Sequence, residues 1–362
     1  GQFLAFEEFQ ARAAASAHEG HFVSETGFVQ RLHAVAGHQQ LMQADAPLVT
    51  RLLAHHATLG AVQLVSPLGA KARGPVVGHG LARGLGHDAA HAAEAAEAIM
   101  TSDTKPKQVA VEFTLGGKNV RIGGICKGAG MIQPGMSATG RRPAALPRGL
   151  HATMLCFITT DAAIEAKALQ AALREAVAQS FNRITVDGDM STNDTVLVLA
   201  NGLAGNSPLT TRPSSLVTFQ TALNHVCLEL AKKIVRDGEG VHRVVTVRLT
   251  GAKNAQEADA AARAVANSAL VKTSWHGGDP NWGRIIDALG YSAATVVEEK
   301  VDIGYSAGGS RKILWSLKRG QPTKAAFKKL CEAVAPTEFD LHINLNLGSA
   351  RAVIYAADLT EA

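Results

Sequence analysis

The stretch that decides the fold reads KGAGMIQPGMSATGRRPAALPRGLHATMLCFITTD and runs from Lys127 to Asp161. It opens with a glycine-rich turn, Lys127 to Met131, and ends in an apolar run, Met154 to Thr159, that predicts a buried strand. The pair Ala152-Thr153 stands directly before this strand. A threonine hydroxyl is a weak nucleophile without a neighbouring base, and a cut before Thr153 would supply that base as the new α-amine.

The composition is that of a globular protein. The chain has 362 residues, 46% of them hydrophobic and 19% charged, which is enough for two lobes or one large layered domain. No apolar run approaches the roughly 18 to 20 residues that a membrane span needs, and no basic start precedes an apolar core. We therefore expect a cytoplasmic protein with no membrane association. The net charge is +5, but no basic stripe carries interleaved aromatic residues, so we expect no nucleic-acid partner.

No residue spacing predicts a metal or a bound cofactor. The four cysteines are far apart and form no CxxC pair, which favours a reduced compartment. Asp187, Asp189 and Ser191 alternate as calcium ligands do, but an EF-hand loop requires glycine and glutamate at the positions of Thr192 and Val198. An Asx turn that holds the loop is the better interpretation.

Apolar periodicity and turn residues predict an α/β protein, with layered helices on mixed β-sheets. Helices are expected at 89–100, 162–179, 214–236 and 256–270, and strands at 109–113, 119–125, 154–159, 196–200, 242–249, 341–347 and 351–356. The first two strands are expected to form a hairpin, and so are the last two. The segment from Lys272 to Arg284, rich in glycine and tryptophan, reads as irregular. No dinucleotide-binding or P-loop glycine motif is present.

From about Ala95 onward the chain resembles the ornithine acetyltransferase family, the glutamate N-acetyltransferases of arginine biosynthesis that mature by cleaving themselves. The motifs that carry the resemblance are EAIMTSDTKPK (97–107), GGICKGAGMIQP (123–134), ATMLCFITTDA (152–162), SFNRITVDGDMSTNDT (180–195), DGEG (237–240), DPNWGRI (279–285) and AADLT (356–360). They are long and occur in the family's order. The resemblance implies an ornithine acetyltransferase-like fold.

The resemblance assigns the nucleophile to Thr153 and the scissile bond to Ala152–Thr153. Cleavage would give an α chain, 1–152, and a β chain, 153–362, expected to assemble as two α and two β chains. The implied reaction is a ping-pong transfer of acetyl from N2-acetylornithine to glutamate through acetyl-Thr153. A free α-amine has a pKa of about 7.7 to 8.0, so it can act as the base near neutral pH.

Three further residues match substrate-contacting positions of the family, namely Thr104, Lys127 and Glu239. Lys127 would bind the carboxylate of an amino-acid substrate, and Glu239 the cationic amino group of the ornithine arm. No cofactor is implied, and acetyl-CoA stays open as an alternative donor.

The chain departs from the family pattern in three places. Residues 1–90 carry none of the N-terminal motifs, residues 137–150 form an insertion just upstream of the scissile bond, and the family pattern continues beyond AADLTEA, where this chain ends. The insertion belongs to segment 91–152 and contains a second Ala-Thr pair, Ala138-Thr139. Two alternatives remain open: an inactive, uncleaved relative, and an amidohydrolase that uses Thr153 with water as the acceptor.

Overall fold

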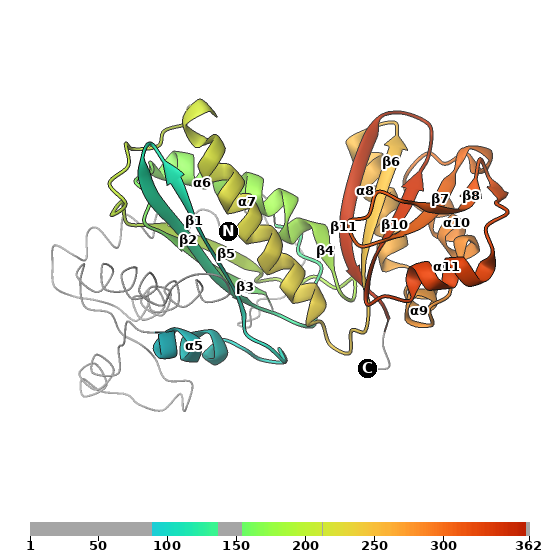
Figure 1. Cartoon of the computed structure of the whole chain (residues 1–362), viewed down its shortest axis with the longest axis horizontal. Helices are drawn as coiled ribbons and strands as arrows, with labels where there is room; N and C mark the ends of the chain where they lie inside the picture. The colour runs from blue at the N-terminus through green and yellow to red at the C-terminus, as the bar shows by residue number, and fades with distance from the viewer. Residues whose placement is uncertain (1–88, 137–153, 212, 360–362) are drawn as a thin grey trace. The chain divides into compact units, whose positions relative to one another are not determined.

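The computed structural model describes residues 89–136, 154–211 and 213–359 (Figure 1). The chain divides into two compact units, and each is described by itself. Among the described residues, the first unit comprises 89–128, 135–136, 154–182, 192–211 and 213–234, and the second unit comprises 129–134, 183–191 and 235–359. None of the described helices is both long and apolar enough to cross a membrane.

The first unit is built on a four-stranded mixed sheet in the order β1-β2-β3-β5. The strands are β1 (Lys107–Leu115), β2 (Lys118–Lys127), β3 (Leu155–Thr160) and β5 (Thr195–Ala200). The hairpin predicted for the first two strands is confirmed, because β1 pairs with β2 antiparallel around the turn Gly116-Gly117. Strand β3 pairs antiparallel with β2 and parallel with β5, so the predicted mixed character of the sheet is also confirmed.

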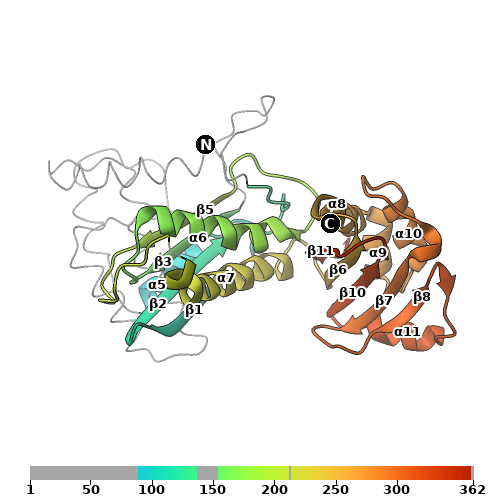
Figure 2. The same ribbon diagram turned by 90° about the horizontal axis from the view of Figure 1, so that it is seen from above.

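Helices pack on both faces of this sheet. They are α5 (Ala89–Ala98), α6 (Ala166–Gln179) and α7 (Pro213–Arg236). Figures 1 and 2 show α7 running alongside β1 and β2, and a Cβ atom added to Gly124 of β2 would lie only 2.8 Å from Leu230 of α7. The neighbouring Ile125 points to the opposite face, since side chains alternate along a strand, and it packs there against Ala95 and Ala96 of α5.

The second unit contains a seven-stranded mixed sheet in the order β4-β11-β6-β10-β7-β8-β9. Its strands are β4 (Ile184–Thr185), β6 (Val244–Ala252), β7 (Asp302–Ala307), β8 (Leu314–Lys318), β9 (Gln321–Pro322), β10 (Glu338–Asn344) and β11 (Ala350–Ala357). The predicted hairpin of the last two strands is wrong, because β6 lies between β10 and β11. In the connection after β10, the amides of Leu345, Leu347 and Gly348 donate to carbonyls at the end of β6. The chain thereby crosses to the other edge of β6, where β11 pairs.

The helices of the second unit are α8 (Ala255–Asn267), α9 (Ala269–His276), α10 (Trp282–Gly290) and α11 (Phe327–Val334), with the 3₁₀ helix η3 (Glu298–Lys300). A further 3₁₀ helix, η2 (Phe181–Arg183), precedes β4. The prediction that 272–284 is irregular is wrong, since α9 and α10 occupy most of it. Ser268 caps α9 by accepting from the Val271 amide at 3.4 Å, and Asn281 caps α10 by accepting from the Arg284 amide at 3.0 Å.

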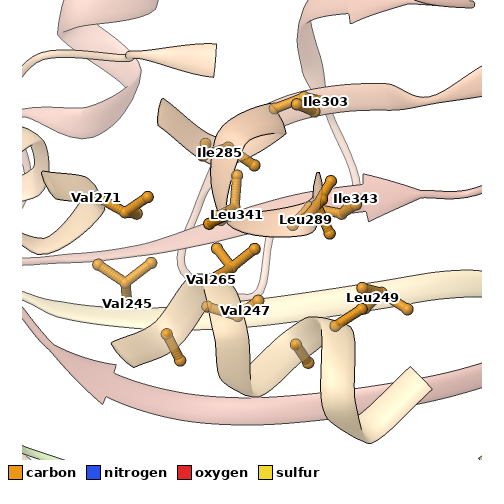
Figure 3. Packing of buried hydrophobic residues seen from close by; sticks show 14 of the residues in the cluster. Val245, Val247, Leu249, Val265, Val271, Ile285, Leu289, Ile303, Leu341 and Ile343 are labelled. Atoms are coloured by element: carbon orange, nitrogen blue, oxygen red, sulfur yellow. The ribbon is translucent and has the colours of Figure 1, made fainter. Parts of the chain in front are cut away.

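The core of the second unit joins the central strands to the helices (Figure 3). The members labelled in Figure 3 are branched aliphatic side chains that are at most 1% exposed, namely Val245, Val247, Leu249, Val265, Val271, Ile285, Leu289, Ile303, Leu341 and Ile343. Val245, Val247 and Leu249 alternate along β6 and therefore share one face of the sheet. The three tryptophans of the chain, Trp275, Trp282 and Trp315, all belong to this unit, so tryptophan fluorescence reports its unfolding.

We expect Leu341→Ala to lower the free energy of unfolding of the second unit by about 2 to 5 kcal/mol, because it opens a cavity beside the central strand β10. Leu341 is 0% exposed. Urea unfolding followed by tryptophan fluorescence measures the loss. The matched control is Leu270→Ala in α9, since Leu270 is 55% exposed and its truncation should change the stability by no more than about 0.5 kcal/mol. Equal losses in both variants would contradict this account of the core.

Candidate active site

The predicted cleavage pair lies outside the described residues. Ala152 and Thr153 belong to the gap between residues 136 and 154, as does the insertion 137–150. The chain is described again from Met154, the residue directly after the predicted nucleophile. The described parts of the predicted site are the groups that hold Met154, with Lys127 and Thr104, in the first unit, and Glu239 in the second unit.

The backbone of Met154 is fixed through both of its hydrogen-bonding groups. Its N–H donates to Oδ1 of Asp194 at 3.2 Å, and its carbonyl accepts from the amide of Thr195 at 3.0 Å. The Met154 side chain is 0% exposed, and Asp194 is buried as well. The start of β3 is thus anchored before its ladder with β5 begins, and a carboxylate lies against the backbone that follows Thr153.

Lys127 is the last residue of β2, where it pairs with Leu155 of β3. Only 5% of it is exposed, and its Nζ donates to Oγ1 of Thr101 at 3.3 Å. Burial lowers the pKa of the Lys127 ammonium, while the carboxylates of Asp103 and Asp194 oppose that shift. The site therefore contains a buried lysine, whose ladder partner Leu155 follows the predicted nucleophile by two residues in the sequence.

Asp103 ties the segment before β1 to the turn after β2. Its Oδ1 accepts from Nζ of Lys107 at 2.5 Å and from the amide of Gly128 at 2.7 Å, and its Oδ2 accepts from the amide of Thr101 at 3.1 Å. Burial alone would raise the pKa of Asp103, but Lys107 and the two amides outweigh it and hold the pKa below its usual value. Asp103 thus stays an anion that fixes the position of Gly128, beside Lys127.

The structure separates the roles of the two threonines in the sequence Thr101-Ser-Asp-Thr104. The hydroxyl that accepts from Lys127 belongs to Thr101. Thr104 is exposed and follows the buried Asp103 directly. Lys127, Thr101 and Asp103 are therefore brought together, whereas Thr104 lies beside this group at the surface of the first unit.

Glu239 lies in the second unit, against residues 129–134 of the turn after β2, which belong to the same unit. Its amide donates to the carbonyl of Ala129 at 3.0 Å. A Cβ atom added to Gly130 would come within 2.7 Å of the Glu239 carboxylate atoms, a distance that real Cβ atoms essentially never show. A side chain at position 130 would therefore displace the Glu239 carboxylate, the flexible end of that side chain. Glu239 itself is exposed.

Asp187 holds the next part of the same turn. Its carboxylate accepts from the amides of Met131 at 2.6 Å and Ile132 at 3.0 Å. It also accepts from the amide of Asp189 at 2.9 Å, two residues on, which is the hydrogen bond of an Asx turn. The Asx-turn interpretation of this loop is confirmed.

The sequence did not reveal how three aspartates hold the site: Asp103 and Asp194 were not singled out, and Asp187 was expected in an Asx turn but not as the acceptor of the Met131 and Ile132 amides. Each stands in a short polar motif of the quoted family segments, SDT, VDG or NDT. Asp next to Ser, Thr, Asn or Gly is a signal for a side chain that accepts from the backbone. The motifs do not show which amide donates to each aspartate, because the donor is far along the chain. It is 25 residues away for Asp103 and 40 residues away for Asp194.

Comparison with known proteins places these motifs in one family. The family model described as ArgJ family matches residues 67–362. The glutamate N-acetyltransferase of Methanocaldococcus jannaschii is 46% identical over 270 residues, which cover 74% of this chain and 62% of that protein. The arginine biosynthesis bifunctional protein ArgJ of Bacillus subtilis is 45% identical over 264 residues, covering 73% of this chain and 60% of that protein. The chain thus spans less than two thirds of the length of these relatives.

A solved structure agrees with the fold. The crystal structure of arginine biosynthesis bifunctional protein ArgJ from Bacillus halodurans superimposes with a TM-score of 0.52 at 41% sequence identity, covering 56% of this chain and 92% of that one. The predicted α/β class, with helices on mixed sheets, is confirmed. Because the family model matches most of the sequence, including the segments that hold Met154, Lys127 and Glu239, the chain belongs to the ArgJ family.

Proposed function

We propose that the protein is a glutamate N-acetyltransferase of arginine biosynthesis, acting in the cytoplasm and taking acetyl from N2-acetylornithine. The observation that carries the proposal is the anchoring of Met154. Asp194 and Thr195 fix the residue after the proposed nucleophile, and the buried Lys127 pairs with the residue after that. The names of the relatives support the same reaction.

The reaction begins with cleavage between Ala152 and Thr153, which frees the Thr153 α-amine. The Thr153 hydroxyl then attacks the acetyl carbonyl of N2-acetylornithine, and the amine accepts the hydroxyl proton. The same proton passes to the leaving nitrogen as its bond to the acetyl group breaks, and ornithine departs. Glutamate attacks acetyl-Thr153 in the second half-reaction and restores the free hydroxyl. No cofactor is needed, and acetyl-CoA is an alternative donor to test.

Lys127 is suited to bind a substrate carboxylate beside the nucleophile. Lys127 pairs on the β2–β3 ladder with Leu155, which follows Thr153 by two residues in the sequence. A buried ammonium makes a stronger charge-assisted hydrogen bond than an exposed one, because less water competes for it.

Glu239 and Thr104 complete the proposed substrate contacts. The exposed carboxylate of Glu239, which lies against Gly130, would bind the side-chain ammonium of ornithine. Thr104 would donate its hydroxyl to the substrate from its exposed position after Asp103. We also propose that the α and β chains remain associated after cleavage, as two α and two β chains.

We expect the purified chain to give two masses that meet at Ala152–Thr153, because the free α-amine is the base that the mechanism requires. Intact-mass spectrometry measures this, and Thr153→Ala should give one full-length mass. The matched control is Thr139→Ala, which removes the other Ala-Thr pair of this segment and should leave cleavage unchanged. A single mass for the unaltered chain, or cleavage lost only in Thr139→Ala, would contradict the assignment.

We expect Lys127→Met to be cleaved normally but to lose about 10- to 100-fold in kcat/KM for N2-acetylornithine. A hydrogen bond to a charged group contributes about 1.5 to 3 kcal/mol, which corresponds to roughly that factor. The measurement is steady-state transfer of acetyl to glutamate. Acetate release is followed in parallel, since acetate without acetylglutamate would indicate an amidohydrolase.

The control for this variant is Lys118→Met, the same change at an exposed residue at the start of β2. It should leave both cleavage and kcat/KM unchanged. If Lys127→Met were cleaved and fully active, the ammonium would have no part in substrate binding.

A further inference from the structure

We propose that His242, His276 and Asp358 of the second unit form a binding site for a divalent transition-metal ion of the Zn²⁺ type. The three residues come from separate elements: His242 precedes β6, His276 ends α9 and Asp358 follows β11. The end of β11 lies beside the start of β6, where Ala357 pairs with Val244. One ligand atom from each of the three residues lies within 4.8 Å of the other two.

Asp358 is oriented for this role by the backbone around it. Its side chain is 0% exposed, and its Oδ1 accepts from the amides of His242 at 3.1 Å and Arg243 at 3.0 Å. Its Oδ2 lies 3.1 Å from Nδ1 of His276. Two ligands at about 2.1 Å from one zinc ion are separated by roughly 3.4 Å at a tetrahedral angle, so this pair needs little movement to share an ion.

The two imidazoles form the open side of the cluster. Their ring centroids are 4.9 Å apart with the planes inclined at 72°. His242 is exposed and the side chain of His276 is 33% exposed, so both rings can turn toward an ion without repacking the core. An ion bound by three protein ligands on this side would keep a position for water, as zinc does in sites that are not fully closed.

The charges around the cluster select the kind of ion. Two cations flank it: Nζ of Lys272 donates to the carbonyl of Ala357, and the Arg243 guanidinium donates to the carbonyl of His276. With one carboxylate and two neighbouring cations, the cluster is poorly suited to Ca²⁺ or Mg²⁺, which need several oxygen ligands. Imidazole nitrogens favour Zn²⁺, Co²⁺, Ni²⁺ and Cu²⁺.

The proposed ion would link the start of β6, the end of α9 and the end of β11. Sequence spacing predicts no metal here, because no metal-binding motif connects the three residues. An ion that binds the folded unit and not the unfolded chain raises the unfolding temperature. The site therefore has a readout that is independent of acetyl transfer.

The experiment is a Co²⁺ titration of the full chain, followed by visible absorption and repeated in competition with Zn²⁺. We expect one equivalent to bind tightly, and we expect His242→Ala and His276→Ala each to weaken it by at least about tenfold. The matched control is His225→Ala, the same change at an exposed residue of α7, which should leave binding unchanged. Because the chain has 14 histidines, the double variant His242→Ala/His276→Ala sets the background.

A second readout is the thermal unfolding of the second unit, followed by tryptophan fluorescence. Zn²⁺ should raise the unfolding temperature of the unaltered chain and of His225→Ala, and should leave that of the double variant unchanged. Far-UV circular dichroism checks that each variant is folded. The proposal is overturned if the unaltered chain binds Co²⁺ no more tightly than the folded double variant, or if Zn²⁺ shifts both unfolding temperatures equally.

Discussion

Buried charge at the end of β2 is the constraint on which the candidate site depends. Asp103, Lys107 and Lys127 are all at least 92% buried in the first unit, where an unpaired charge would be strongly destabilising. The fold meets this requirement by pairing Asp103 with Lys107 and with two backbone amides. The attraction of Asp103 and Asp194 opposes the lowering of the Lys127 pKa that burial causes. A lysine side chain is thus accommodated inside the protein, because the groups around it are themselves fixed.

Aspartate carboxylates accept hydrogen bonds from backbone amides just beyond the ends of the β-ladders. Backbone N–H groups beyond the end of a strand need acceptors, and at several such points an aspartate supplies one. In the first unit, Asp103 receives the amide of Gly128 and Asp194 receives that of Met154. In the second unit, Asp187 receives those of Met131 and Ile132. The loops that carry the candidate site are therefore held by charge-assisted bonds, which specify their geometry more tightly than water would.

Sequence patterns predicted correctly the elements that depend on neighbouring residues. They failed for elements whose position depends on residues far apart in the sequence. The β1–β2 hairpin and the long helix α7 followed from periodicity and turn residues. Helices α9 and α10 were not predicted, because each is short and its surrounding sequence is rich in glycine and tryptophan. Strand β11 was predicted to pair with β10, whereas it pairs with β6. Lys127 and Glu239 entered through the family resemblance. Neither the burial of Lys127 nor its aspartate neighbours could be read from spacing, since both arise from tertiary packing.

The strand order also bears on what proposed cleavage would do to the first unit. Strand β2 belongs to the proposed α chain, and β3 belongs to the β chain. The two strands are joined by a ladder of six residue pairs, from Ile122–Thr160 to Lys127–Leu155. Leu230 of the β chain packs at Gly124 on one face of β2, and Ala95 and Ala96 of the α chain pack against Phe157 in the core on the other. Because β3 lies between β2 and β5, separating the chains would break a central ladder and open both cores. A cut before Thr153 would therefore free the α-amine of Thr153 while strand β3, which follows it, stays paired in the sheet.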